Sequence, residues 1–456
     1  MNGEVSMKKK ALLAMLLVMT LLLSSCALIK KDEAVDAATV ILKLGDEEIT
    51  KAEVQKATQA TLGNMSQYYA MFGSDLDVTD PEVIASAQSS AITGLKKQMT
   101  IRAKTNELGL NLTDEELAAA KETARSDWDS DKEAVKAYYL TEDELALEGD
   151  ALEEVLRKRM EEIGLKIEDY EKDAADSALA AKLKEYAIRD VTVPDEDVKA
   201  DFDSKVAADE EKYKEDLEAW ATADRKGTTT LYYTPAGIRR IKQILVKFKE
   251  DDQAAIDDAN GKITNANNRI SEAQTTLDSE DASEEEKKQA EEEKAAAEAD
   301  KTAAEAELKE ATDKAFANLD EDADAILAAL AEDPDSWDKL AEEKNEDPGM
   351  KTGAVNAENG YAVFEGMTSF DSAFVDAAMA LGAVGDISGK VRGETYGYYI
   401  LKYAGNAAEG PIDFETVKES IHSSLLKTKQ DDTYTETLNA WVEEMGIKED
   451  LGALKD

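Results

Sequence analysis

Gln243 is a polar residue within a segment that otherwise has the pattern of a half-buried β-strand. In GIRRIKQILVKF, residues 237–248, the alternation places Ile241, Gln243 and Leu245 on one face. An amide donates and accepts hydrogen bonds but does not titrate in the physiological range. Gln243 therefore suits the organisation of a buried polar site, and it does not suit general acid or base catalysis.

The single histidine and the single cysteine exclude several kinds of chemistry. No internal disulfide and no zinc site of the Cys/His type can be built from one residue of each kind. His422 lies beside the apolar stripe Val417, Ile421 and Leu425, which predicts a partly exposed helix residue. Neither a Walker loop nor a dinucleotide fingerprint occurs in the sequence, and we expect no cofactor and no metal.

The remaining cysteine, Cys26, lies at the end of an N-terminal targeting pattern. Three lysines at 8–10 precede an apolar run at 11–23, and Leu-Ser-Ser-Cys follows. This run is short for a membrane span and has the form of a secretory signal, and its end resembles a bacterial lipobox. The pattern predicts that Cys26 is the lipid anchor of a protein held outside the cytoplasm on a bacterial cell membrane.

The net charge of the chain restricts the kinds of partner that we expect it to bind. Its 456 residues include 100 acidic and 54 basic side chains, for a formal net charge of −46. Such a surface repels phosphate backbones, so we expect no nucleic-acid partner. The length predicts two or three domains.

Two long helical regions flank a mixed region. A strand and a T-x-x-E capping box at Thr50 and Glu53 open a helical region that extends to about residue 218. Residues 250–315 follow the strand of Gln243, and Ile263, Ile270 and Leu277 recur there every seven residues. This period predicts an antiparallel helical hairpin, which serves either as a solvated spacer or as a binding arm.

The order of elements after residue 236 resembles a known family. RRIKQILVKF, WDKLAEEKNEDPG and FDSAFVDAAMALGAVGDISGKVRGETYGYYILKY are similar to parvulin-type (PpiC) peptidyl-prolyl isomerase domains, and the flanks resemble the chaperone module of PrsA- and SurA-like foldase lipoproteins. The resemblance implies an α+β fold with a four-stranded antiparallel sheet. It implies these segments: signal peptide 1–25, tether 26–36, N-terminal helical chaperone module 37–235, parvulin-like domain 236–406 with the hairpin insertion 250–315, and C-terminal helices 407–456 completing the module.

The resemblance also assigns the site residues. Parvulins of this kind have histidines where this chain has Gln243 and Tyr399, and an acidic or cysteine residue where it has Asp347. A hydrogen bond from the Gln243 amide to the Tyr399 hydroxyl is expected to replace the histidine pair. The proline-binding residues implied by the family are Phe364, Met367, Phe370 and Phe374.

These features together predict a membrane-anchored foldase for unfolded or newly secreted polypeptides, with weak isomerase activity. The substitution of both histidines favours an alternative, a chaperone that holds clients without catalysis. A surface scaffold that uses the 250–315 arm and a solute-binding lipoprotein are further alternatives, although the helical flanks disfavour the latter. An open, cradle-like module is compatible with a homodimer.

Overall fold

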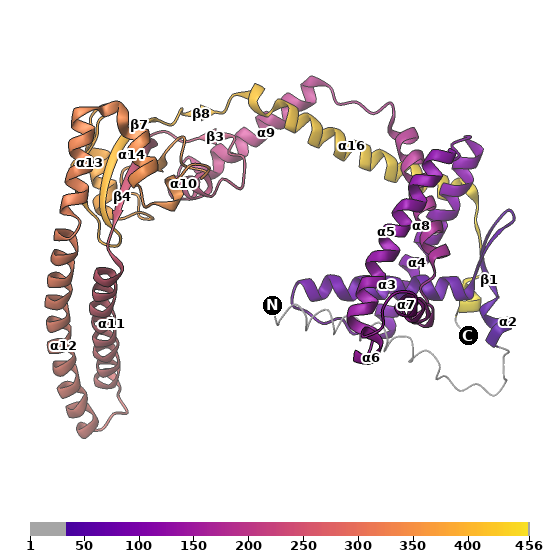
Figure 1. The fold of residues 1–456 in the computed structure, drawn as a ribbon, viewed down its shortest axis with the longest axis horizontal. Coiled ribbons are helices and arrows are strands. Elements are labelled where there is room, and N and C mark those ends of the chain that lie inside the picture. Colours follow the sequence, from indigo (N-terminus) through magenta and orange to yellow (C-terminus); the bar gives the residue numbers. More distant parts are fainter. Residues whose placement is uncertain (1–32, 455–456) are drawn as a thin grey trace. The chain divides into compact units, whose positions relative to one another are not determined.

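The computed structural model describes residues 33–454 in two compact units. The first unit contains residues 33–193 and 423–454, and the second contains residues 194–422. The signal peptide, Cys26 and most of the tether therefore lie outside the described residues. Within the described part, no helix is both long and apolar enough to span a bilayer. Figure 1 shows the helices and strands of both units.

The first unit joins both ends of the described chain in one small sheet. Strands β1 (Val40–Leu44), β2 (Glu47–Thr50) and β9 (Lys448–Glu449) are antiparallel, in the order β2-β1-β9. Ile41, Leu42, Val54 and Met99 form a buried core against this sheet together with Ile447, which comes from the C-terminal segment. The hydrophobic core of this unit thus requires residues more than 340 positions apart.

Most of the first unit is helical. Its helices are α2 (Glu33–Ala37), α3 (Lys51–Met71), α4 (Pro81–Glu107), α5 (Asp114–Tyr139), α6 (Glu142–Leu145), α7 (Asp150–Glu162) and α8 (Ile167–Ile188). α3 packs on α4, and α8 packs on both α4 and α5. The predicted capping box is confirmed, because Thr50 Oγ1 accepts from the Glu53 backbone and the Glu53 carboxylate accepts from the Thr50 backbone.

The second unit is built on a four-stranded antiparallel sheet. The strand order is β5 (Tyr361–Val363), β4 (Arg239–Lys247), β7 (Gly397–Asn406) and β6 (Val391–Arg392). A two-stranded ladder of β3 (Tyr233–Thr234) and β8 (Gly410–Pro411) accompanies it. Besides a long helical hairpin at 250–317, this unit contains the helices α9 (Asp195–Tyr213), α10 (Leu217–Lys226), α13 (Asp320–Glu332), α14 (Trp337–Lys344) and α15 (Ser372–Ala380), and two short 3₁₀ turns, Pro334–Ser336 and Pro348–Met350. Helix α16 (Phe414–Met445) begins in the second unit and continues into the first.

The alternation of β4 separates two cores, as the sequence predicts. Ile241 and Leu245 point into one buried cluster with Tyr361, Phe374 and Tyr399. Ile244 and Val246 point into the other cluster, on the opposite face of the sheet. Both faces are covered because α13 packs over one and α15 over the other. The predicted α+β class with a four-stranded antiparallel sheet is confirmed.

An antiparallel helical hairpin follows β4 directly. α11 (Glu250–Asp278) and α12 (Glu284–Ala317) lie side by side in Figure 1. Small residues at heptad spacing are buried along both helices: Ala259, Ala266 and Ala273 on α11, and Ala290, Ala297 and Ala304 on α12. The predicted stripe Ile263, Ile270 and Leu277 is only half-buried.

Ion pairs and aromatic contacts set the register and the root of the hairpin. Arg269 binds both Glu293 and Asp300 across the two helices, at 2.6 Å each. At the root, the ring of Phe316 lies 4.9 Å from that of Phe248 and 4.7 Å from that of Tyr398. The base of the hairpin therefore packs into the same hydrophobic core that supports β4 and β7. The assignment of the chain's segments to a chaperone module and a parvulin-like domain stays a prediction.

Candidate functional site

A pocket of about 540 Å³ opens on the face of the second unit's sheet where Gln243 lies. Strands β4 and β7, the loop after α14 and the start of α15 supply its walls. The lining residues are Arg225, Gln243, Leu245, Lys247, Asp347, Pro348, Tyr361, Ser369, Phe370, Asp371, Phe374, Thr395, Tyr396 and Tyr399. All three residues predicted to replace the family's catalytic set, Gln243, Asp347 and Tyr399, therefore line one cavity.

Asp347 is the acceptor at the centre of a buried polar network. Gln243 Nε2 donates to Asp347 Oδ2 at 2.6 Å, and the Tyr361 hydroxyl donates to the same oxygen at 2.9 Å. The backbone N–H of Gly349 donates to Asp347 Oδ1 at 2.9 Å. Since a carboxylate cannot donate, this arrangement fixes which end of the Gln243 amide faces Asp347. Gln243 Oε1 is left buried without a hydrogen-bond partner among the described residues.

The loop that presents Asp347 completes the edge of β4. β5 pairs with β4 only at residues 239–241, so the later part of that edge has no strand beside it. Asn345 fills this role: its Oδ1 accepts from Leu245 N at 2.8 Å, and its Nδ2 donates to Gln243 O at 2.8 Å. The same Oδ1 accepts from Asp347 N at 3.0 Å. Asn345 thus satisfies the open strand edge and places Asp347 beside Gln243.

Tyr399 has a different partner from the one predicted. Its hydroxyl donates to Asp371 Oδ2 at 3.4 Å, and the Gln243 amide bonds to Asp347 instead. The predicted Gln243–Tyr399 hydrogen bond is therefore wrong. The two residues are diagonal neighbours, because Gln243 lies opposite Leu401 and Tyr399 lies opposite Leu245. Each side chain bonds instead to a carboxylate from a neighbouring loop, Gln243 to Asp347 and Tyr399 to Asp371.

Tyr361 and Tyr399, two tyrosines that line the pocket, are not acids at physiological pH. Burial, and then the charge of Asp347, raises the pKa of the Tyr361 phenol. Burial, and then the charge of Asp371, does the same to the pKa of Tyr399. Both hydroxyls therefore remain neutral hydrogen-bonding groups.

A row of aromatic rings forms the apolar wall of the pocket. The ring centroids of Tyr361 and Phe370 are 5.2 Å apart, those of Phe370 and Phe374 are 5.2 Å apart, and those of Phe374 and Tyr399 are 5.4 Å apart. The Arg225 guanidinium lies 4.9 Å from the centroid of Phe370. An apolar ring such as that of proline fits against a wall of this kind.

The four predicted proline-binding residues are divided by the structure. Phe370 and Phe374 line the pocket, whereas Phe364 and Met367 are buried in the core that supports it. The sequence did not identify Asn345, Tyr361, Asp371 or Arg225. Asn345 and Asp371 had a local signal, since Asn345 lies two residues before Asp347 and Asp371 directly follows Phe370. Tyr361 and Arg225 reach the pocket through long-range packing.

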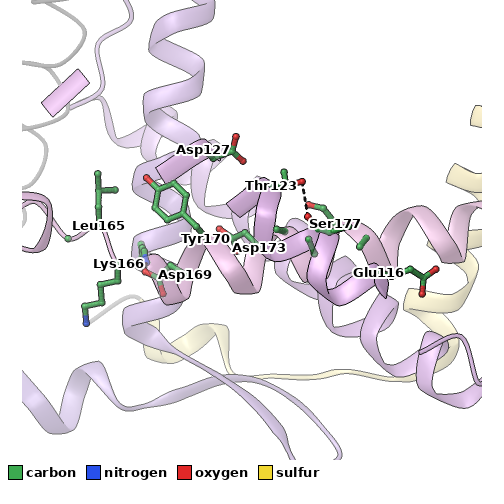
Figure 2. A pocket seen from close by; sticks show the side chains of 15 residues that line it. Glu116, Thr123, Asp127, Leu165, Lys166, Asp169, Tyr170, Asp173 and Ser177 are labelled. Atoms are coloured by element: carbon green, nitrogen blue, oxygen red, sulfur yellow. Dashed lines mark hydrogen bonds and ion pairs between the residues drawn. The ribbon is translucent and has the colours of Figure 1, made fainter. Parts of the chain in front are cut away.

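A second, larger hollow lies in the first unit, between α5 and α8. It measures about 730 Å³, and Figure 2 shows Tyr170, Asp173 and Ser177 of α8 facing Thr123 and Asp127 of α5. Its lining includes four alanines, four acidic side chains and two lysines. His422, half-buried on α16, lines neither hollow. Within residues 33–454, no cluster of three or more His, Cys, Asp or Glu side chains could hold a metal ion.

Sequence comparison identifies relatives of known role. No family model matches the chain. The foldase protein PrsA of Clostridium botulinum strain Hall and that of strain ATCC 19397 are each 34% identical to it over 112 residues, which is 24% of this chain and 31% of the relative. The match thus spans about a third of the length of these curated relatives. The predicted resemblance to the PrsA-like foldases is confirmed.

Solved structures give a weaker likeness. A SurA-like chaperone of Campylobacter jejuni aligns with a TM-score of 0.23 at 16% identity, covering 89% of this chain and 97% of that one. The foldase protein PrsA of Streptococcus pneumoniae aligns with a TM-score of 0.20 at 14% identity, covering 91% and 97% respectively. TM-scores this low support no conclusion about the site.

Proposed function

We propose that this member of the PrsA/SurA-like foldases assists the folding of exported polypeptides outside the cytoplasm, anchored to the membrane through Cys26. The second unit would bind X-Pro segments of unfolded clients in the pocket between β4, β7 and α15. The observation that supports this most directly is the buried Gln243–Asp347–Tyr361 network beside a row of aromatic rings. The proposed anchor depends on the sequence pattern around Cys26, which lies outside the described residues.

Catalysis at such a site would be physical rather than covalent. Rotation about the peptide bond has a barrier of about 18–20 kcal/mol, because the twisted amide loses its resonance. A pocket that holds proline against Phe370 and Phe374 and removes water from the preceding carbonyl would favour the twisted state. Gln243 and Tyr399 would act only as neutral hydrogen-bonding groups. We therefore expect isomerisation that is weak and independent of pH between about pH 6 and 8, where a histidine would titrate.

The test is isomerisation of a short X-Pro peptide by the protein lacking residues 1–26. Asp347→Ala should remove the activity, because Gln243 and Tyr361 lose their common acceptor. Asp338→Ala is the matched control, since its side chain is 86% exposed and lies on α14 away from the pocket. Activity that is equal in wild type and Asp347→Ala would refute a catalytic role for this network.

A chaperone without catalysis is the second candidate. The absence of a histidine at 243 and at 399 favours it. It predicts that wild type delays aggregation of an unfolded client while the X-Pro peptide shows no acceleration. Gln243→His with Tyr399→His would then restore isomerisation if the rest of the pocket is intact. A wild-type protein that neither delays aggregation nor binds an unfolded client would contradict both candidates.

A surface scaffold remains a third candidate, favoured by the length and acidity of the α11–α12 hairpin. Replacing residues 250–317 with a short loop separates it from the other two. A scaffold would lose its envelope partner, whereas a chaperone would still delay aggregation. Sedimentation velocity of the wild type and of this hairpin deletion tests whether the chain forms a homodimer and whether the hairpin contributes to it.

A further inference from the structure

The C-terminal end of α3 exposes a cluster of large apolar side chains. Tyr68 is 62% exposed, Tyr69 43%, Met71 81% and Phe72 69%. These four residues, called the α3 aromatic cluster below, fall within five positions of the sequence. Across the described residues, only two other aromatic side chains, Tyr138 and Tyr396, are among the exposed large hydrophobic ones. Apolar exposure is thus concentrated at one place in the first unit.

The cluster exists because α3 extends beyond its own core. Val54, Thr58 and Leu62 recur every four residues and are buried, so they form the packed face of the helix. No residue of α3 after Leu62 is buried, and 67–71 are all exposed. The Tyr68 ring lies 5.1 Å from that of Phe72 and 6.3 Å from that of Tyr69. The rings therefore contact one another and form a small apolar surface without packing into the unit.

The charged residues next to the α3 aromatic cluster indicate which kinds of partner can bind there. Between residues 57 and 95 the chain has no lysine or arginine, and it has Asp75, Asp77, Asp80 and Glu82 directly after the cluster. All four acidic residues are exposed. Hydrogen bonds from Thr79 lower the pKa of Asp77, so this carboxylate stays ionised. An apolar surface with an acidic border attracts cationic partners and repels anionic lipid and a second copy of this acidic chain.

We propose that the α3 aromatic cluster binds segments of unfolded client polypeptides in which apolar side chains alternate with lysine or arginine. This inference rests on the proposed foldase function and specifies which clients the first unit holds. Tyrosine and phenylalanine offer large contact areas at low entropic cost, and methionine adapts to side chains of varied shape. An exposed cluster that accepts many sequences weakly suits a chaperone, whose clients must leave again in order to fold.

The experiment uses the protein lacking residues 1–26 and two fluorescent 15-residue peptides without proline. One peptide combines leucine and phenylalanine with arginine, and the other has aspartate in place of each arginine. Binding is measured by fluorescence anisotropy at low salt. Omitting proline removes the contribution expected from the pocket of the second unit.

The test variant is Tyr68→Ser/Tyr69→Ser/Met71→Ser/Phe72→Ser. Its matched control is Val35→Ser/Val384→Ser/Leu451→Ser, which changes exposed hydrophobic residues elsewhere. We expect the test variant to bind the arginine peptide roughly tenfold more weakly than wild type, and the control to bind it as wild type does. The aspartate peptide should bind wild type weakly. In wild type, the arginine peptide should also slow amide hydrogen exchange at 63–72, a readout that needs no variant.

The outcomes separate this inference from the proposed function. Suppose that wild type and test variant bind the peptide equally and both still delay aggregation of an unfolded client. This result refutes client binding by the α3 aromatic cluster and leaves the foldase proposal unaffected. Loss of self-association in the variant with unchanged peptide binding identifies a dimer contact instead, and binding to anionic vesicles in preference to the peptide identifies a lipid contact. Either result also overturns the inference. Wild type that neither binds peptide nor delays aggregation overturns the foldase proposal as well.

Discussion

Replacing Asn345 with alanine is a test of how the pocket is held together. Asn345 is 4% exposed and makes three hydrogen bonds, to Leu245 N, Gln243 O and Asp347 N. It does not line the pocket, so its loss changes no group that would touch a peptide. The substitution removes both side-chain bonds to the edge of β4 and the bond that orients Asp347.

The expected loss in the free energy of unfolding follows from the number of hydrogen bonds that Asn345 makes and from the burial of their partners. Each net hydrogen bond is worth about 1 kcal/mol, and a buried backbone group left unpaired costs about 1–3 kcal/mol. The loop can move away and admit water to the strand edge, which limits the penalty. We therefore expect Asn345→Ala to lower the free energy of unfolding of the second unit by about 3 kcal/mol. Isomerase activity should fall with it, because Asp347 is no longer held beside Gln243.

The assay is urea unfolding followed by tryptophan fluorescence, since Trp220 and Trp337 are both buried in the second unit. Asn356→Ala is the matched control: Asn356 is 6% exposed but makes one long hydrogen bond, 3.3 Å from its Nδ2 to Arg225 O. It should cost about 1 kcal/mol or less. If Asn345→Ala is no more destabilising than Asn356→Ala, the proposed role of Asn345 at the strand edge is refuted.

Three further substitutions test other parts of the structure. Phe316→Ala removes a buried ring at the root of the hairpin and should destabilise the second unit by about 3–5 kcal/mol, measured by urea unfolding. Asp431→Asn tests the pKa of Asp431, which hydrogen bonds from Lys184 and Lys427 lower to about 2. Because this pKa is lower in the folded state, wild type should be more stable than the variant above about pH 4, and the difference in stability should shrink as the pH falls from 4 to 2; a difference of the same size at pH 4 and pH 2 contradicts this. Tyr399→Phe removes one 3.4 Å bond to Asp371 and should cost no more than about 1 kcal/mol, whereas a larger loss in thermal unfolding would mean that the phenol has a stronger partner.

Local features of this protein could be predicted from the sequence because neighbouring residues decide them. The alternation around Gln243 predicts two faces of a strand, and the structure places Ile241 and Leu245 on one face and Ile244 and Val246 on the other. The capping box at Thr50 depends on residues three positions apart. The heptad period of α11 predicts a helical hairpin. It also predicts that the isoleucines form the contact between the helices, whereas the structure buries alanines at heptad spacing and leaves the isoleucines half-buried.

The site itself was predicted only as a set of residues. The sequence identified Gln243, Asp347 and Tyr399, and all three line one pocket. It did not predict their partners, since the bond between Gln243 and Asp347 joins residues 104 positions apart. Which donor meets which acceptor depends on the register of β4 and β7 and on the path of the loop after α14.

Sequence by itself determined the acidic character of the chain, its predicted export signal, its helices and strands and the residue types of the pocket, because each depends on composition or on short-range periodicity. Only tertiary structure decided that Asn345 completes the edge of β4, that β9 returns to pair with β1, and that the end of α3 stays uncovered. These features depend on which distant segments pack together, and the same local pattern is compatible with many such arrangements.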